Sequence, residues 1–248
     1  MFSVKNLNIL FFGGTGELGS HVALELSFMG AKVTIVGRSK EKGEDIIRRS
    51  SGVIEFIQFD ALKDTNEKEI ISTYVKENGK IDVLVNASGI NSATPFEDIT
   101  PHEIKSIMRV NYELVSNCCA EALIHMKEQK SGSIINFGSI SGITPLSRVY
   151  TYSASKGALH NLTKNIAREY GKYGIRINTL VPGFFPAEQN KKILSEDRIK
   201  TIIDHTPMGR FGSPEDLYGP CIFLCSPASL FVTGTEIVVD GGFNATKI

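Results

Sequence analysis

Short apolar runs that favour β-strands alternate with longer helix-like segments along the whole chain of 248 residues. Several of these runs are almost continuously apolar, which is typical of strands that helices cover on both faces. The strand candidates are Leu7–Phe12, Lys32–Val36, Val53–Phe59, Ile81–Asn86, Ser133–Phe137, Ile175–Val181 and Glu236–Val239. This alternation predicts an α/β protein with a doubly wound parallel sheet of about seven strands and helices on both faces.

The helix candidates fill the gaps between these strands, at Glu17–Met29, Glu41–Arg49, Asp64–Glu77, Pro101–Glu128, Tyr152–Tyr173 and Pro214–Cys225. No internal repeat or linker-like tract divides the chain, so residues 1–248 are expected to form a single domain. The stretch 182–210 departs from the alternation and follows the carboxyl end of a strand, where open α/β sheets bind ligands. We predict that it is a substrate-binding excursion.

Composition favours a small-molecule partner. Lysine plus arginine and aspartate plus glutamate both number 27, so no net charge attracts nucleic acid or an anionic membrane surface. No apolar run approaches the roughly 20 residues that span a bilayer, and we expect a cytoplasmic protein. The cysteines lie in apolar helical patterns and the histidines are scattered, so we expect no metal site.

Ser139, Tyr152 and Lys156 together suggest a proton-transfer site. Residues four apart on a helix share a face, with Cβ atoms about 5–6 Å apart, so Tyr152 and Lys156 can act on one point. The phenol of tyrosine has an ordinary pKa of about 10, and a neighbouring cation favours the phenolate and lowers that value. The pair alone is common on exposed helices, so the remaining motifs must support it.

A glycine-rich turn, Gly13-Gly14-Thr15-Gly16-Glu17-Leu18-Gly19, joins the first strand to the first helix. Free amides and the helix dipole at such a turn favour a phosphate, which suggests a nucleotide site. The second strand ends in Gly37-Arg38-Ser39, where an acid would bind a ribose 2′-hydroxyl and an arginine accommodates a 2′-phosphate. The cofactor is therefore predicted to be NADP(H), with NAD(H) still open because Arg38 could be an ordinary solvated charge.

These motifs resemble those of the short-chain dehydrogenase/reductase family, and the resemblance covers essentially the whole chain. It includes Asp60-Ala61 at the end of the third strand, Asn86-Ala87-Ser88-Gly89 after the fourth, and Pro182-Gly183 after the sixth. The resemblance implies a Rossmann-type fold and an NAD(P)(H)-dependent oxidoreductase that interconverts a ketone and a secondary alcohol. The cofactor-binding residues it implies are Gly13, Thr15, Gly16, Glu17, Leu18, Gly19, Arg38, Ser39, Asp60, Ala61, Asn86, Ala87, Ser88, Gly89, Tyr152, Lys156, Pro182 and Gly183.

The resemblance also implies the catalytic roles. Tyr152 would exchange a proton with the substrate oxygen, and Ser139 would hydrogen-bond that oxygen. Lys156 would lower the pKa of Tyr152 and bind the nicotinamide ribose. Asn111 would hold a water that links Lys156 to solvent. The family commonly forms homotetramers, and the long helices Pro101–Glu128 and Tyr152–Tyr173 would then form a dimer surface.

The chain departs from the family pattern in three places. Phe12 replaces a threonine, and Glu17 replaces the middle glycine of the phosphate turn. An acid near a bound pyrophosphate would repel it, so we predict that the Glu17 side chain points away. The segment Phe184–Ala187 stands where the family often has a threonine that bonds the cofactor carboxamide.

Residues 182–190 and 205–212 resemble family members that act on sugar acids, such as fructuronate (mannonate) reductases and gluconate 5-dehydrogenases. A sugar acid brings a carboxylate, for which Arg148 is the first candidate partner, with Ser139 and Tyr152 at the reacting oxygen. Gln189 and Asn190 are predicted to bind hydroxyl groups. The alternatives are a 3-ketoacyl-carrier-protein reductase and a nucleotide-sensing homologue without turnover.

Overall fold

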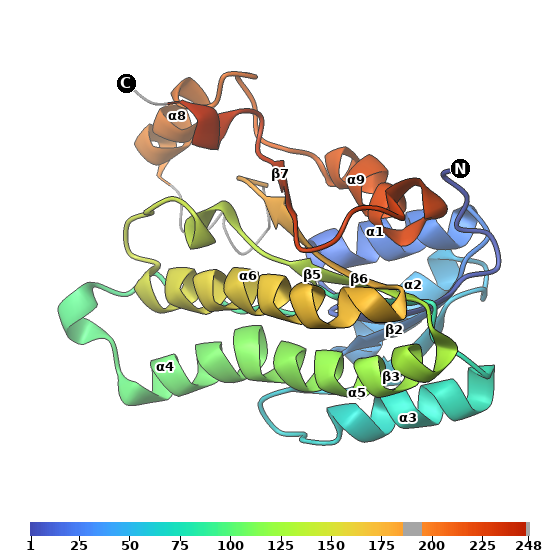
Figure 1. The fold of residues 1–248 in the computed structure, drawn as a ribbon. Coiled ribbons are helices and arrows are strands. Elements are labelled where there is room, and N and C mark those ends of the chain that lie inside the picture. The colour runs from blue at the N-terminus through green and yellow to red at the C-terminus, as the bar shows by residue number, and fades with distance from the viewer. Residues whose placement is uncertain (186–194, 247–248) are drawn as a thin grey trace.

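The computed structural model describes residues 1–185 and 195–246 (Figure 1). Within these residues the strands are β1 (Asn8–Phe12), β2 (Lys32–Gly37), β3 (Glu55–Gln58), β4 (Val83–Asn86), β5 (Gly132–Phe137), β6 (Ile175–Pro182) and β7 (Glu236–Val239). They form one sheet in the order β3-β2-β1-β4-β5-β6-β7, and every neighbouring pair is parallel. The predicted fold class is confirmed.

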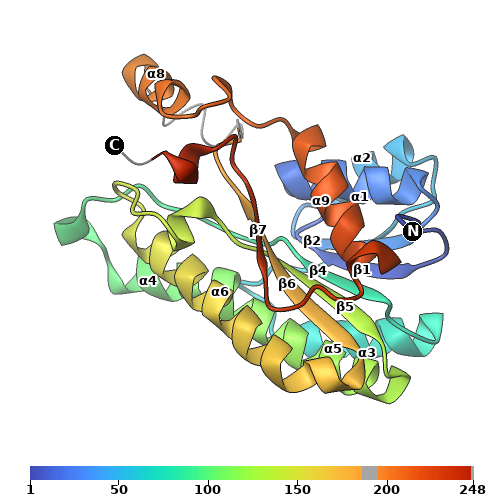
Figure 2. The same cartoon turned by 45° about the horizontal axis from the view of Figure 1, so that its top comes forward.

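Helices cover both faces of this sheet (Figure 2). One layer contains α1 (Glu17–Phe28), α2 (Lys40–Arg49) and α9 (Tyr218–Cys225), and the other contains α3 (Glu67–Asn78), α4 (Pro101–Met108), α5 (Leu114–Gln129) and α6 (Tyr150–Tyr170). A further helix, α8 (Glu196–Asp204), lies beyond the edge of the sheet at which β6 and β7 end. In the described part of the chain, no helix has both the length and the apolar character to cross a membrane.

The central strand β1 shows how the sequence builds two cores. All five of its residues are buried. Ile9 and Phe11 pack into the core beneath α1 and α9, whereas Leu10 and Phe12 pack into the core beneath α3, α5 and α6. Because successive side chains of a strand point to opposite faces, a continuously apolar strand needs a helical layer on each side.

Two parts of the helical pattern differ from the sequence prediction. The single helix expected over Pro101–Glu128 is divided into α4 and α5 by a π-helical turn, Arg109–Glu113. Such turns often occur at functional sites. Helix α8 lies within the predicted excursion and was not predicted, although Ile199, Ile202 and Ile203 follow the i, i+3, i+4 spacing of an amphipathic helix.

A buried ion pair fixes the start of the π-helical turn. Arg109 donates to both carboxylate oxygens of Glu67 on α3, at 2.9 and 3.0 Å, and also to the Asp64 carbonyl at 3.0 Å. The Glu67 side chain is 2% exposed, and Asn117 donates a further hydrogen bond to it at 2.8 Å. Burial acts to raise the pKa of Glu67, but these hydrogen bonds outweigh it and the pKa is lowered.

Replacing Glu67 by alanine removes both short hydrogen bonds between Arg109 and a carboxylate, and leaves this buried cation only a longer ion pair with the exposed Glu113, at 3.7 Å. Removal of one partner of a buried pair costs about 3–5 kcal/mol, so urea denaturation should show Glu67→Ala to be destabilised by that amount. The matched control is Glu44→Ala, because Glu44 forms an exposed pair with Lys40 and such pairs contribute about 0–1 kcal/mol. Equal stability losses in the two variants would contradict this account of the turn.

Candidate functional site

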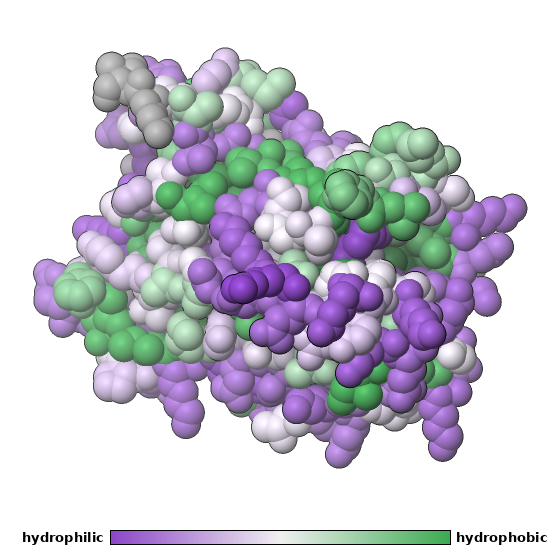
Figure 3. Space-filling model, in the orientation of Figure 1, coloured by the Kyte–Doolittle hydropathy of each residue, from purple (hydrophilic) through white to green (hydrophobic). Residues whose placement is uncertain are grey.

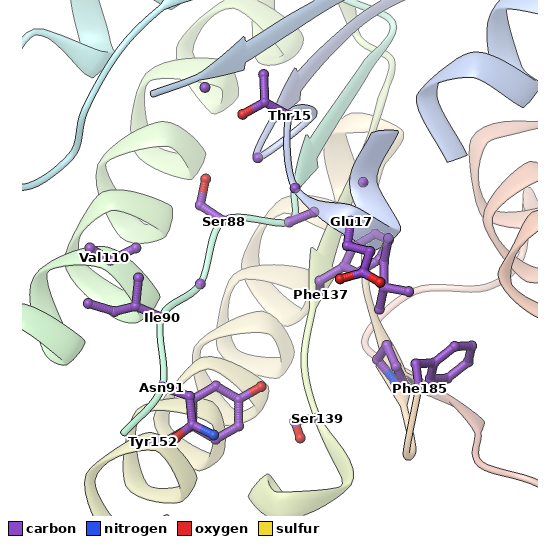
Figure 4. Close-up of a pocket in the computed structure, with 18 of the residues that line it drawn as sticks. Thr15, Glu17, Ser88, Ile90, Asn91, Val110, Phe137, Ser139, Tyr152 and Phe185 are labelled. Atoms are coloured by element: carbon purple, nitrogen blue, oxygen red, sulfur yellow. The ribbon is translucent and has the colours of Figure 1, made fainter. Parts of the chain in front are cut away.

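A cavity of about 1290 Å³ opens at the carboxyl ends of the strands (Figure 4). Strand β1 pairs with β2 on one side and with β4 on the other, so the chain order reverses there. In open α/β sheets, ligands bind at this topological switch point. The predicted cofactor-binding residues that line the cavity are Gly13, Thr15, Gly16, Glu17, Leu18, Gly19, Arg38, Ser39, Asp60, Ala61, Ala87, Ser88, Gly89, Tyr152, Lys156, Pro182 and Gly183.

Asn86 is the predicted cofactor-binding residue that does not line the cavity. It is buried at the end of β4, and its amide donates to Asn136 Oδ1 on β5 at 2.9 Å. The Asn136 amide in turn donates to Thr163 Oγ1 on α6, also at 2.9 Å. The prediction is corrected accordingly: the Asn86 side chain ties two strands to α6 behind the cavity.

That the Glu17 side chain points away from a bound pyrophosphate stays a prediction. The Glu17 side chain lines the cavity, and Figure 4 shows it extending inward from the first turn of α1. The Cα–Cβ bond of a helical residue tilts toward the helix N-terminus. Because the N-terminus of α1 opens onto the cavity, this tilt directs Glu17 into the cavity and not away from it.

The end of the cavity beside β2 is basic. Arg38, Lys42 and Arg49 all line it, from the end of β2 and from α2, and one acid, Asp45, lines it beside them and pairs with Arg49 at 3.8 Å. A Cβ added to Gly37 would overlap the Thr15 side chain, so no acid fits at this strand end without a shift. The sequence prediction missed Lys42 and Arg49, although their spacing along α2 could have revealed them.

Ser139 and Tyr152 meet at the opposite end of the cavity, where Figure 4 shows both side chains facing one space. Ser139 Oγ accepts hydrogen bonds from the backbone N–H and the hydroxyl of Ser141, at 3.2 and 3.0 Å. A hydroxyl has two acceptor sites and one donor. Because both acceptor sites are occupied, the Ser139 hydroxyl can act only as a donor, toward Tyr152.

Lys156 lies one turn after Tyr152 on α6, and its Nζ donates to the Phe137 carbonyl at 2.7 Å. Its ammonium stands 5.7 Å from the centre of the Tyr152 ring. Burial lowers the pKa of Lys156 to about 8. Burial therefore destabilises the ammonium form of Lys156, and the side chain begins to lose its proton under mildly alkaline conditions.

The sequence prediction gave the sign of the Tyr152 shift incorrectly. Burial raises the pKa of Tyr152 above its ordinary value, and a hydrogen bond with Ser139 lowers it only in part. Burial disfavours both the phenolate of Tyr152 and the ammonium of Lys156. Tyr152 therefore keeps its proton to a higher pH than its spacing from Lys156 suggests. The phenol keeps its proton at neutral pH and can donate it.

Asn111 lies in the π-helical turn and is fully buried. Its Oδ1 accepts the Ile90 backbone N–H at 2.9 Å, and its Nδ2 donates to the Ile90 carbonyl and to Ser155 Oγ, both at 3.0 Å. A Cβ added to Gly89 would lie 3.6 Å from Asn111 Oδ1 and 3.7 Å from Lys156 Nζ. The amide of Asn111 and the ammonium of Lys156 thus both lie close to Gly89.

Two arginines line the mouth of the cavity beside Ser139 and Tyr152. Arg148 precedes α6 with a φ of 64°, in the left-handed region, and Arg198 comes from α8. Arg198 also donates to Ser147 Oγ at 2.9 Å, which connects α8 to the loop before α6. The sequence prediction included Arg148 but missed Arg198, because α8 itself was not predicted.

Other candidates for binding the substrate are differently placed. Arg210 forms a bidentate pair with Asp216, at 2.6 and 3.0 Å, so its guanidinium is already used. Gln189 and Asn190 lie outside the described residues. No group of three or more metal-ligating side chains comes together within 1–185 and 195–246.

The comparisons with known proteins all point to the same protein family. A family model described as enoyl-(acyl carrier protein) reductase matches residues 15–244. The chain is 33% identical to the 2-dehydro-3-deoxy-D-gluconate 5-dehydrogenase of Formosa agariphila, over 99% of this chain and 96% of that protein. It is 34% identical to the 3alpha-hydroxysteroid dehydrogenase of Mediterraneibacter gnavus, over 96% and 97%.

Among solved structures, a gluconate 5-dehydrogenase from Burkholderia cenocepacia, in complex with NADP and tartrate, matches with a TM-score of 0.93. The two chains are 31% identical, and the match covers 99% of this chain and 98% of the other. Sequence, fold and the placement of the motifs around one cavity agree. The chain belongs to the short-chain dehydrogenase/reductase family and is an oxidoreductase of that family.

Proposed function

We propose that this protein is an NADP(H)-preferring oxidoreductase that interconverts a ketone and a secondary alcohol on a small sugar acid. The observation that carries the proposal is the layout of one cavity: a basic end beside β2, a proton donor formed by Ser139 and Tyr152, and two arginines at the mouth. The ends of this cavity offer separate contacts for a phosphorylated nucleotide, a carbonyl group and a carboxylate.

The basic end supports the cofactor preference. Arg38 and Lys42 offer two cations to a 2′-phosphate, and Arg49 lies beside them in an ion pair with Asp45 at 3.8 Å. An acid at position 37, which would bind a 2′-hydroxyl, would overlap the Thr15 side chain unless that side chain shifted. The gluconate 5-dehydrogenase from Burkholderia cenocepacia was solved with NADP, which agrees with this preference. When bound, the nicotinamide would supply or accept the hydride.

The proton comes from the protein in this scheme. Ser139 donates toward the oxygen at the reacting carbon and holds it beside Tyr152, and Tyr152 transfers its proton to that oxygen as negative charge develops. The raised pKa of Tyr152 keeps the phenol protonated at neutral pH, which favours the reduction of a ketone. In the reverse direction Tyr152 must first lose its proton, so oxidation of an alcohol benefits from alkaline pH.

Lys156 and Asn111 would resupply this proton. The ammonium of Lys156 has three N–H groups, of which one is donated to the Phe137 carbonyl. Because Gly89 has no side chain, the space between Asn111 and Lys156 can hold a water. The hydrogen bonds of Asn111 to Ile90 hold that segment in place beside the cavity.

The two arginines support an acidic substrate. A guanidinium matches the geometry of a carboxylate and binds it with charge-assisted hydrogen bonds. Arg148 and Arg198 reach the cavity mouth from different elements, so a carboxylate between them would orient the rest of the molecule toward Tyr152. Tartrate, found with the Burkholderia protein, and the substrate named for the Formosa protein are both acids.

We also infer a homotetramer, which exposed apolar side chains support. Leu230 and Phe231 are exposed just before the edge strand β7, and Val238 is exposed on it. Figure 3 shows apolar side chains reaching the surface in this region. Ile104 and Ile124 are exposed on α4 and α5, within the helices that the sequence suggests for a dimer surface. Light scattering measures the assembly directly.

The overall test is a panel of keto-aldonates, uronates and neutral ketones, run with NADPH and with NADH while the absorbance of the reduced cofactor is followed. Turnover of an acidic ketose with NADPH is the expected result. Tight cofactor binding without turnover of any substrate would instead favour a nucleotide-sensing protein.

Removing the phenolic hydroxyl should abolish proton transfer. General acid catalysis contributes about 10²–10⁴-fold, so Tyr152→Phe should lose that factor in kcat while its Kd for NADPH, measured by fluorescence, stays unchanged. Tyr150→Phe removes a hydroxyl from the same helix but outside the cavity lining and serves as the matched control. Retention of kcat in Tyr152→Phe would exclude this residue as the proton donor.

Loss of Arg38 should weaken NADPH and spare NADH. A hydrogen bond to a charged group contributes about 1.5–3 kcal/mol, so Arg38→Ala should raise the KM for NADPH about 10- to 100-fold. Lys40→Ala is the control, because Lys40 is an exposed neighbour that does not line the cavity. An equal effect on both dinucleotides would show that Arg38 does not contact the 2′-phosphate.

A comparison of acidic and neutral substrates tests whether Arg148 and Arg198 bind the carboxylate of the substrate. Arg148→Ala and Arg198→Ala should each raise the KM for an acidic ketose by about tenfold, the value of one charge-assisted hydrogen bond. The KM for a neutral ketone and the Kd for NADPH should not change. Lys200→Ala removes a charge from α8 that pairs with Asp204 and is the control. An arginine whose loss leaves every KM unaltered is not in the substrate site.

A further inference from the structure

A buried histidine lies directly behind the proposed proton donor. His160 is on α6, one turn beyond Lys156 and two turns beyond Tyr152, so the three side chains share one face of the helix. It is 3% exposed and is not among the described residues that line the cavity. The chemistry proposed above gives this titratable group no role.

Two glycines make room for the His160 ring. A Cβ added to Gly138 would overlap the imidazole Nε2, and one added to Gly142 would come within 3.1 Å of Cε1. These glycines stand on either side of Ser139 in the turn after β5. The imidazole therefore fills a slot that exists because Gly138 and Gly142 lack side chains.

His160 makes a specific hydrogen bond in that slot. Its Nε2 accepts the backbone N–H of Ser139 at 3.3 Å. An imidazole nitrogen that accepts carries no proton, so the neutral ring holds its hydrogen on Nδ1. Nδ1 faces Glu236 Oε2 on β7 at 3.6 Å, and Glu236 in turn pairs with Lys164 at 2.5 Å.

Helix α6 thus holds the backbone on both sides of Gly138. Lys156 donates to the Phe137 carbonyl at 2.7 Å, and His160 accepts the amide of Ser139. These two bonds set the distance between the strand end that carries Ser139 and the helix that carries Tyr152. Displacements of about 1 Å in reacting groups can cost a factor of 10² in rate.

We propose that neutral His160 is a positioning residue that holds Ser139 against Tyr152, and that its protonation inactivates the site in acid. The inference rests on the proposed function, in which Ser139 orients the reacting oxygen. On protonation Nε2 becomes a donor, the Ser139 amide loses its acceptor, and a second cation appears behind Lys156.

The charged groups facing His160 come from two elements. Glu236 approaches from β7, whereas Lys156 and Lys164 are on α6 itself, and the nearby Thr179 of β6 does not titrate. Burial lowers the pKa of His160, Glu236 raises it, and the two lysines lower it, with a net shift below the ordinary value. The neutral form is therefore present at neutral pH and is lost as pH falls through the lowered pKa.

Two substitutions of His160 distinguish the effect of its hydrogen bond on kcat from the effect of its ring volume. His160→Leu fills the slot without an acceptor and leaves the Ser139 amide unpaired, so kcat should fall about 10-fold or more while the KM for NADPH is unchanged. His160→Gln can place its amide oxygen near the position of Nε2. It should restore most of the lost kcat and remove the fall in activity that the proposal expects of the wild type in acid.

Opposite pH shifts provide a readout that a merely structural residue would not give. Glu236→Gln removes an anion beside the ring and should move the acid fall in kcat to lower pH. Lys164→Gln removes a cation and should move it to higher pH. His125→Gln is the control, since His125 lies on α5 with its own carboxylate partner, Glu121, at 3.4 Å. An acid limb that stays in place in Glu236→Gln, Lys164→Gln and His160→Gln would overturn the inference.

A measurement without turnover distinguishes this inference from the proposed function. In protein labelled with ¹⁵N-serine, the Ser139 amide resonance should shift with the midpoint of the His160 titration and stay constant in His160→Gln. If no substrate in the panel reacts, the proposed function fails and this titration still decides the role of His160. A Ser139 amide that ignores the titration of the ring would refute it.

Discussion

The site depends first on the parallel pairing of all the strands. Parallel strands bring their carboxyl ends to one edge, so segments far apart in the chain, such as Gly13, Ser88, Ser139 and Gly183, line one cavity. The pairing is possible because each central strand is apolar on both faces and is covered by two helical layers. The same covering brings α6 against β5, and thereby Tyr152 against Ser139.

Buried polar contacts then set the geometry within this frame. The chain of amides from Asn86 through Asn136 to Thr163 joins two strand ends to α6, and the pair of Arg109 and Glu67 fixes the π-helical turn that presents Asn111. Each of these groups would be costly to bury without its partner. The elements that carry the candidate site are therefore joined by residues that do not themselves line the cavity.

Much of this could be predicted from the sequence because the signals are local. The apolar runs marked every strand, the glycine turn marked the phosphate end, and Tyr152 with Lys156 marked one face of a helix. What could not be predicted depends on long-range packing. Arg198 reaches the site because α8 packs near the loop before α6, and the pKa of Tyr152 follows the burial of its side chain, which spacing does not reveal.

The contact between Gly37 and Thr15 has a consequence for how this chain can diverge. A single replacement of Gly37 by an acid would introduce a side chain into space that Thr15 already occupies. Such a replacement therefore requires the Thr15 side chain to shift or to become smaller. Because Thr15 belongs to the glycine-rich turn, a change of residue at the end of β2 is coupled through one steric contact to the conformation of that turn.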